Sequence, residues 1–202
     1  MAAPGPTVDG ELARGLGALP DAAALCVAYS GGADSTVLLD ACRRLAPGRP
    51  LRAVHVHHGL AAGADAWVAH CAAFCAAQAI PFDVRRVVVT PAGEGPEAAA
   101  RAARYAALRD ALAPGEYLLT AHHADDQLET VLLHLARGSG IEGLAGIPAL
   151  QPFGRGYLWR PLLAVPRAVI VAAARAGGFA TIADPANADP RFDRVFLRSR
   201  AV

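Results

Sequence analysis

The stretch that most constrains this chain is a turn of small polar residues, 30–35, with the sequence Ser-Gly-Gly-Ala-Asp-Ser. The apolar run 25–28 before it predicts a buried strand, and the apolar spacing over 36–45 predicts a helix. A glycine-rich turn at a helix N-terminus offers backbone N–H groups and the positive end of the helix dipole to an anion. Gly31 and Gly32 would let the backbone approach such a ligand closely. The turn therefore predicts a phosphate site.

Side chains of the same turn extend this prediction. Ser30, Ser35 and Thr36 supply hydroxyl donors, and Asp34 supplies a carboxylate that suits Mg²⁺. The alternative is an ordinary strand–helix turn with an N-cap serine. The longer string Ser-Gly-Gly-x-Asp-Ser resembles the pyrophosphate-binding loop of the N-type ATP pyrophosphatases, the PP-loop family, which cleave ATP between its α and β phosphates. Ser30, Gly31, Gly32, Asp34 and Ser35 are then the expected nucleotide-binding residues.

The chain contains no lysine, so all 19 basic side chains are arginine. A Walker P-loop, a lysyl-adenylate ligase and a pyridoxal-phosphate Schiff base are excluded, because each needs a lysine. Phosphates must therefore be held by backbone and hydroxyl donors, aided by arginines from elsewhere in the chain.

Length and composition set further bounds. A chain of 202 residues with a net charge of +1 predicts one domain, and its charge argues neither for nor against nucleic acid. Neither a run of 18 apolar residues nor a secretory signal stands out, so we expect a cytoplasmic protein with no membrane contact. We expect the four cysteines to be buried free thiols, with a metal or redox role as the alternative. They are Cys26, Cys42, Cys71 and Cys75.

Strand patterns alternate with helix patterns along the chain. Strands are expected at 25–28, 51–57, 82–89, 116–120 and, as a short extended piece, 157–163. Helices are expected at 9–19, 36–45, 65–78, from 97, from about 121, and at 165–177. This alternation predicts an α/β fold, an open and mostly parallel sheet with helices on both faces. We expect an N-terminal extension with a short helix over 1–20 and a catalytic domain over 21–202, whose last 40 or so residues form a helical and irregular extension on the substrate side.

Three histidines, His55, His57 and His58, lie at the end of the second expected strand. Alternation places His55 and His57 on one face of the sheet and Val54 and Val56 on the other. We consider three roles for these histidines: hydrogen bonding within the protein, contact with a nucleotide, and metal binding.

Two arginines lie three residues apart on the helix that starts at 97. Arg101 and Arg104 would project from one face, where they can clamp a phosphate. The alternative for Arg101 is an exposed ion pair with Glu97 at i, i+4 spacing.

A histidine and several acids open the next helix. His122 and Asp126 stand at i, i+4 spacing, as do Asp125 and Glu129. Acidic residues are common at helix N-termini, but that preference leaves the paired His122 and His123 unexplained. We expect a Mg²⁺ or ATP site here, with Zn²⁺ hydrolysis as a weaker option because hard carboxylates dominate.

The helix that follows stops at Arg137-Gly138-Ser139-Gly140. Gly138 suits the position after a helix end, and the same loop is a candidate second anion site with Arg137 beside it. Arginines gather near the C-terminus, where an RNA contact and a solvated helix face are both open: Arg191, Arg194, Arg198 and Arg200.

Taken together, these motifs resemble tRNA(Ile)-lysidine synthases in type and order. The matching strings are 30–35, His-Val-His-His-Gly-Leu at 55–60, Glu-x-x-Ala-Arg-x-x-Arg-Tyr at 97–105, His-His-x-Asp-Asp-Gln-x-Glu-Thr at 122–130, Arg-Gly-Ser-Gly at 137–140, Arg-Pro-Leu-Leu at 160–163 and Asp-x-x-Asn-x-Asp at 184–189. The chain departs from the family at Ala61, where arginine is frequent, and at 194–198, where two polar residues are missing.

The resemblance implies a reaction. ATP would adenylate C2 of the wobble cytidine in tRNA(Ile) with a CAU anticodon, releasing pyrophosphate, and free L-lysine would then displace AMP. It implies catalytic roles for Asp34, Arg101, Arg104, His122, Asp125 and Asp126, ATP contacts from the 30–35 loop, His55, Arg137 and Gly138, and Mg²⁺ on Asp34 and Asp126. The family's C-terminal tRNA-binding domains are absent from these 202 residues, and a homodimer is left open.

Other functions remain as alternatives. A PP-loop tRNA thiolase would need paired cysteines near the site, whereas Cys71 and Cys75 lie on an expected helix. A short relative with another adenylated substrate, a nucleotide-binding module without catalysis, and a metal hydrolase built on the histidines are the others. Asp34, Asp125 and Asp126 argue against a module that has lost catalysis.

Overall fold

A computed structural model describes residues 5–59, 63–89, 95–136, 138, 140 and 144–182. Its centre is a six-stranded sheet with the order β3-β2-β1-β4-β6-β5. The strands are β1 (Leu25–Ala28), β2 (Leu51–His57), β3 (Phe82–Arg86), β4 (Tyr117–Leu119), β5 (Leu150–Phe153) and β6 (Gly156–Trp159). All neighbours pair in parallel except β5, which runs antiparallel to β6 at one edge. The expected open, mostly parallel α/β sheet is confirmed.

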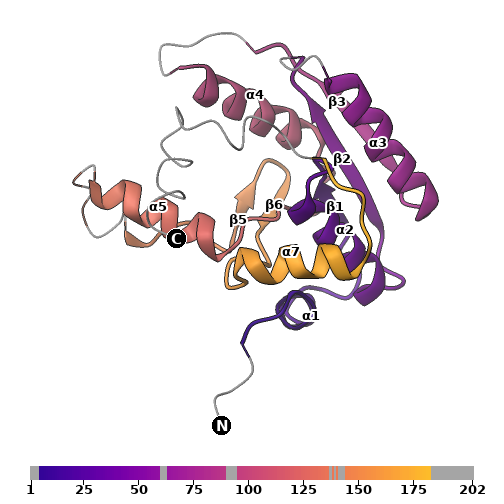
Figure 1. Cartoon of the computed structure of the whole chain (residues 1–202), viewed down its shortest axis with the longest axis horizontal. Coiled ribbons are helices and arrows are strands. Elements are labelled where there is room, and N and C mark those ends of the chain that lie inside the picture. The colour runs from indigo at the N-terminus through magenta and orange to yellow at the C-terminus, as the bar shows by residue number, and fades with distance from the viewer. Residues whose placement is uncertain are drawn as a thin grey trace.

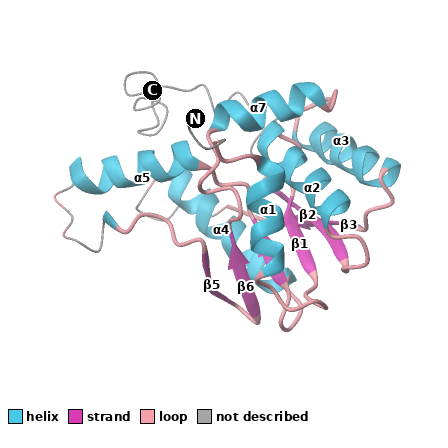
Figure 2. Ribbon diagram, turned by 90° about the horizontal axis from the view of Figure 1, so that it is seen from below, coloured by secondary structure: helices cyan, strands magenta, loops and turns pink. Residues whose placement is uncertain are grey.

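Helices cover both faces of this sheet. The described helices are α1 (Val8–Gly17), α2 (Ala33–Leu45), α3 (Ala64–Ala77), α4 (Pro96–Ala111), α5 (Ala124–Ala136) and α7 (Arg167–Ala176). One hydrophobic cluster joins α1, α2, α3 and α7 to one face, and a smaller cluster joins α4 to the other. Figure 1 shows α4 on one side of the strands and α1 and α7 on the opposite side, and Figure 2 shows α2 and α3 beside α7. Within the described residues, no helix has the length and apolar character needed to cross a bilayer.

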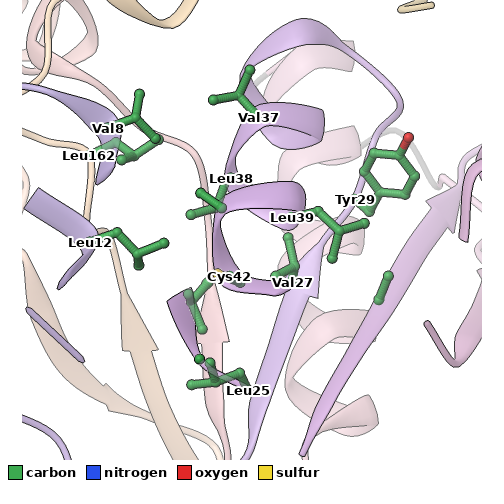
Figure 3. Close-up of a cluster of buried hydrophobic side chains, with 14 of the residues drawn as sticks. Val8, Leu12, Leu25, Val27, Tyr29, Val37, Leu38, Leu39, Cys42 and Leu162 are labelled. Atoms are coloured by element: carbon green, nitrogen blue, oxygen red, sulfur yellow. The ribbon is translucent and has the colours of Figure 1, made fainter. Parts of the chain in front are cut away.

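The larger core is built on β1 and α2, the two elements that flank the 30–35 turn. Leu25 and Val27 of β1 meet Leu38 and Leu39 of α2, and all four side chains are fully buried (Figure 3). Helix α1, expected in an N-terminal extension, packs into this same core through Val8, Leu12 and Leu16. The turn between β1 and α2 is therefore anchored on both sides by close-packed apolar side chains.

Local sequence accounts for where several helices begin. The side chain of Thr7 caps α1 by accepting a hydrogen bond of 3.1 Å from the Gly10 N–H. Pro96 occupies the first turn of α4, where its missing N–H leaves no helical bond unmade. In contrast, α2 begins after Gly32 with no side-chain cap, so its N-terminal dipole is open to a ligand.

Four strands differ from the sequence prediction. Strand β4 covers Tyr117–Leu119 rather than 116–120. Strand β3 ends at Arg86 rather than Val89. Strand β5 was missed altogether, because its four residues include a proline and lack the alternation of a half-buried strand. Proline cannot donate to a sheet ladder, and β5 tolerates Pro152 because it is an edge strand. The extended piece expected at 157–163 is β6 over Gly156–Trp159, followed by turns.

A buried ion pair ties β2 to the turn before β4. The guanidinium of Arg52 donates to both carboxylate oxygens of Glu116, at 2.7 and 2.6 Å, and also to the Ala111 carbonyl. Glu116 accepts a further bond from the Ala113 N–H at 2.9 Å. Because the Glu116 side chain is only 5% exposed, removing it would leave several buried donors unsatisfied.

We therefore predict that Glu116→Ala lowers the free energy of unfolding by about 3 kcal/mol, because it leaves the partly buried Arg52 charge uncompensated. The matched control is Asp83→Ala, which removes an ion pair to Arg85 in which both side chains are over 40% exposed. That change should lower the free energy of unfolding by less than about 1 kcal/mol. Urea unfolding monitored by circular dichroism measures both. Equal losses in the two variants would contradict the prediction.

Candidate functional site

The candidate site lies where the strand order changes direction. Strand β1 pairs in parallel with β2 on one side and with β4 on the other, although β4 follows it by some ninety residues. Connections from β1 and β4 therefore leave the same edge of the sheet in opposite directions, and open α/β sheets bind ligands in the crevice that forms at such a point. The segment 29–32 follows β1 and the segment 120–123 follows β4, so the two motifs singled out in the sequence face each other across this crevice.

The 30–35 turn is held in shape largely by its own hydroxyl groups. Ser35 Oγ accepts from the Ser30 N–H at 3.2 Å and donates to the Gly32 carbonyl at 3.1 Å, and Thr36 Oγ1 donates to the same carbonyl at 2.9 Å. Gly31 has a φ of +82°, which favours glycine. The N-cap position belongs to Gly32 rather than to a serine, so the alternative of an N-cap serine is wrong. The first N–H groups of α2 and the hydroxyl of the exposed Ser30 are the donors that an anion can reach.

The His123 ring lies between the two turns. Its Nε2 lies 3.9 Å from Asp34 Oδ2 and 3.4 Å from Asp126 Oδ2, and its Nδ1 lies 3.7 Å from Asp125 Oδ2. The ring is 3% exposed, so these carboxylates surround a buried imidazole. The structure therefore brings together Asp34 from the β1–α2 turn and Asp125 and Asp126 from the start of α5, as the sequence predicted, around a histidine that it did not single out.

Two of these carboxylates also cap helices. Asp126 Oδ2 accepts from the His123 N–H at 3.0 Å, while the Asp126 N–H faces His123 Nδ1 at 3.4 Å. This reciprocal arrangement is a capping box with histidine at the N-cap of α5. Asp125 Oδ2 accepts from the Arg167 N–H at the start of α7 at 2.9 Å. The acids at this helix start are thus fixed in place by backbone hydrogen bonds.

The buried side chains of α5 are acidic rather than apolar. Among its described residues, the buried ones are Asp126 and Glu129, and Glu129 is 1% exposed. Burial of carboxylates is unfavourable unless a cation or hydrogen-bond donors compensate it, and the His123 N–H supplies one such donor to Asp126. Two i, i+3 spacings in the sequence could have selected His123 and Glu129. The spacing of His123 and Asp126 is that of a capping box, and Glu129 stands three residues after Asp126 on the same helix.

His122 is influenced both by the Asp126 carboxylate of this cluster and by the charges of three arginines. Its Nδ1 contacts Thr120 Oγ1 at 2.8 Å. Burial lowers the pKa of His122 from 6.5 to about 3; the Asp126 carboxylate opposes this shift, and the charges of Arg160, Arg101 and Arg104 add to it. Helix α5 begins after His122, so the i, i+4 helical spacing to Asp126 expected from the sequence does not apply.

The arginine group combines two predicted residues with one that the sequence did not select for the site. The guanidinium carbons of Arg101 and Arg104 lie 4.8 and 5.5 Å from the Tyr105 ring centre. Arg160, at the end of β6, is 5% exposed and donates to the Pro148 carbonyl at 2.6 Å. Burial lowers the pKa of Arg160, and the charge of Arg101 lowers it further. This part of the crevice is therefore positively charged and suited to a phosphate.

Of hydrogen bonding, nucleotide contact and metal binding, the structure shows the hydrogen-bonding role for His55. Its Nδ1 lies 2.9 Å from the Tyr29 carbonyl, just ahead of the 30–35 turn, and burial lowers its pKa. His57 lies 3.3 Å from Asp65 of α3. Both side chains face the α3 side and Val54 and Val56 face the α4 side, as the alternation predicted. Contact between His55 and a nucleotide stays a prediction.

Several predicted residues lie outside the described part of the chain. They are Arg137, the 184–189 motif, Ala61 and the C-terminal arginines at 191, 194, 198 and 200. Gly138 is described: its φ is +68° and its N–H donates to the Leu135 carbonyl, which confirms the expected position just after α5. Its role in anion binding stays a prediction.

The donor chemistry fits Mg²⁺ better than Zn²⁺. In the described ranges, no group of three or more histidine, cysteine or acidic side chains is arranged around a common metal position. Mg²⁺ needs fewer protein ligands, because it keeps several waters and takes its remaining oxygens from substrate phosphates. Asp34 and Asp126, each with a carboxylate oxygen within 4 Å of His123 Nε2, are a suitable carboxylate pair beside a phosphate loop.

The model of the PP-loop domain family matches residues 8–202. The chain belongs to the PP-loop domain family. This PP-loop domain is 54% identical over 204 residues to the tRNA(Ile)-lysidine synthase of Alkalilimnicola ehrlichii, covering 97% of this chain and 45% of that protein. It is 48% identical over 198 residues to the synthase of Pseudomonas aeruginosa, covering 96% of this chain and 45% of that protein. It thus spans less than half the length of these relatives.

A solved structure with the same fold is the U34-tRNA thiolase NcsA from Methanococcus maripaludis with its [4Fe-4S] cluster. The match has a TM-score of 0.77 at 16% identity and covers 95% of this chain and 70% of that chain. At this identity the likeness concerns the fold alone. It confirms the α/β fold of the six-stranded sheet and its helices.

The lowered pKa of His122 predicts a pH dependence of stability. In the unfolded chain His122 takes up a proton near pH 6.5, whereas in the folded chain it stays neutral down to about pH 3. The unfolded state therefore binds more protons between these values, and stability falls as the pH drops below 6.5. His122→Gln should reduce that fall by up to about 1.4 kcal/mol per pH unit. Urea unfolding of both proteins from pH 8 to pH 5 measures it; parallel curves would contradict the assignment.

Proposed function

We propose that this PP-loop domain is the catalytic part of a cytoplasmic, ATP-dependent ligase that forms lysidine at the wobble cytidine, position 34, of tRNA(Ile) with a CAU anticodon. One observation carries the proposal: a phosphate-binding turn and a buried His–Asp cluster meet at the sheet crevice of a chain about half identical to lysidine synthases. The substrates would be ATP, free L-lysine and the tRNA.

The first step is adenylation of the base. The O2 atom of cytidine attacks the α-phosphorus of ATP, the bond to the β-phosphate oxygen breaks, and pyrophosphate leaves. The N–H groups at the start of α2 and the Ser30 hydroxyl suit the leaving pyrophosphate. Arg101 and Arg104 suit the charge that develops on the α-phosphate. Asp34 and Asp126 would hold Mg²⁺, which neutralises phosphate charge when bound.

The second step is displacement of AMP by lysine. The lysine amine forms a bond to C2, the C2–O2 bond breaks, AMP leaves with that oxygen, and the amine protons pass to solvent. The buried carboxylates on α5, Asp126 and Glu129, suit a substrate that carries ammonium charge. The backbone hydrogen bond that holds Asp126 beside His123 means that this carboxylate needs little reorganisation when the substrate binds.

Thiolation, the other PP-loop reaction considered, has weaker support. All four cysteines are buried free thiols. Burial raises the pKa of Cys26, Cys42 and Cys71 to about 12, so their reactive thiolate forms are disfavoured at neutral pH. None of these thiols has the electropositive, partly exposed surroundings that a sulfur-transfer cysteine uses.

The proposal is tested by incubating the purified chain with Mg²⁺-ATP, labelled lysine and a CAU-anticodon tRNA(Ile) transcript. We expect pyrophosphate release and lysine incorporation into acid-insoluble RNA. Asp34→Asn should reduce both at least 100-fold, on the scale of losing one transition-state contact. The matched control is Asp40→Asn on the same helix, since Asp40 pairs with Arg43 and Arg44 away from the crevice. Pyrophosphate release without lysine transfer would support adenylation of a different substrate.

The arginine assignment gives a second test. Arg104→Gln should lower kcat for pyrophosphate release by about 10²-fold while ATP binding changes less, because the charge it stabilises develops in the transition state. Arg109→Gln on the same helix is the control, because Arg109 lies over the Phe153 ring instead. Initial rates at varied ATP concentration separate kcat from KM. A change in KM alone would place Arg104 in ground-state binding.

A further inference from the structure

The segment after α7 lies directly against the phosphate-binding turn. We call residues Phe179–Ile182 the strap. It is anchored at its start by the Phe179 ring, which packs edge-on against Phe74 of α3 with ring centres 5.9 Å apart. At its end the Ile182 N–H donates to the Gly31 carbonyl at 2.9 Å. Figure 1 draws this segment in yellow, running from the end of α7 back towards the sheet.

Gly31 is enclosed between the strap and α3. A Cβ atom at Gly31 would lie 2.6 Å from Ile182 Cδ1 and 2.9 Å from Cys71 Sγ. The turn is thus packed on one side by the strap and on the other by a fully buried thiol of α3. These contacts join three separate parts of the chain at the one residue of the turn that has a positive φ.

The hydrogen bond from Ile182 also fixes a peptide orientation. In a trans peptide the carbonyl and the following N–H point in opposite directions. With the Gly31 carbonyl turned towards Ile182, the Gly32 N–H points away from the strap, towards the exposed side of the turn, where it lies 3.4 Å from Ser30 Oγ. That contact is long for a hydrogen bond, so a phosphate oxygen can take its place. The Gly32 N–H also lies at the N-cap of α2, where the helix dipole adds to its attraction for an anion.

We propose that Ile182 is a positioning residue for pyrophosphate binding: its backbone N–H holds the Gly31–Gly32 peptide in the orientation that presents the Gly32 N–H to a phosphate. The inference rests on the proposed function only in taking the 30–35 turn as the pyrophosphate site. It connects the end of the described chain to the phosphate site through a single main-chain hydrogen bond. Ile182 would act through the turn and not by contact with pyrophosphate.

The test replaces one amide by an ester. Nonsense suppression with the α-hydroxy acid analogue of isoleucine removes the N–H at 182 and leaves the side chain unchanged. The matched control places the phenylalanine analogue at 179, where the N–H donates to the Ala174 carbonyl at 3.2 Å and makes no contact with the turn. Isothermal titration with inorganic pyrophosphate and Mg²⁺ measures affinity for the full 202-residue chain, and thermal unfolding measures stability.

We expect the ester at 182 to weaken pyrophosphate binding about tenfold, the scale of a misaligned charge-assisted hydrogen bond. The ester at 179 and Ile182→Val, which keeps the N–H, should bind as the unaltered chain does. Equal weakening by the two esters, or none from the ester at 182, would overturn the inference. So would an unaltered chain that binds no pyrophosphate. Because this titration contains neither tRNA nor lysine, failure of lysine transfer alone would count against the proposed function and not against the role of Ile182.

Discussion

The parallel pairing of β1 with both β2 and β4 is the constraint on which the rest of the structure depends. It places two turns from distant parts of the chain at one edge of the sheet and leaves a crevice between them. The apolar packing of β1 and α2 holds the first turn, and the backbone caps of α5 and α7 hold the second. His123 then spans the gap, with carboxylates of both turns within 4 Å of its ring nitrogens.

Groups of both charges act on the two adjacent histidines of this site. Carboxylates lie within 4 Å of the His123 ring nitrogens, while His122 feels the charges of Arg101, Arg104 and Arg160 as well as that of Asp126. A protein interior screens such charges poorly, so each group strongly favours ligands of the opposite sign. A reaction that joins a cationic amine to a phosphate-activated base needs groups of both charges close together.

At this site, the same side chains that cap helices or shape the turn are those proposed to bind ligands. Asp125 and Asp126 close the N-termini of α7 and α5, which fixes their positions before any substrate arrives. Ser35 and Thr36 shape the phosphate turn with the hydroxyl groups that the sequence assigned to the phosphate itself. Rigid placement of the loop is therefore achieved with its own donors, and the backbone N–H groups of α2 remain to meet an anion.

The sequence by itself determined the α/β alternation, the phosphate turn and the presence of Asp34, Asp125 and Asp126 near one another. The first two features depend on local periodicity and glycine placement, and the third was implied by the motifs that the chain shares with lysidine synthases. Tertiary structure alone decided which histidine is central, because α5 starts at Ala124 and turns His123, not His122, towards Asp34. It also decided the roles of Arg160, β5 and Ile182, since their contacts come from segments far apart in the chain and no local pattern encodes such contacts.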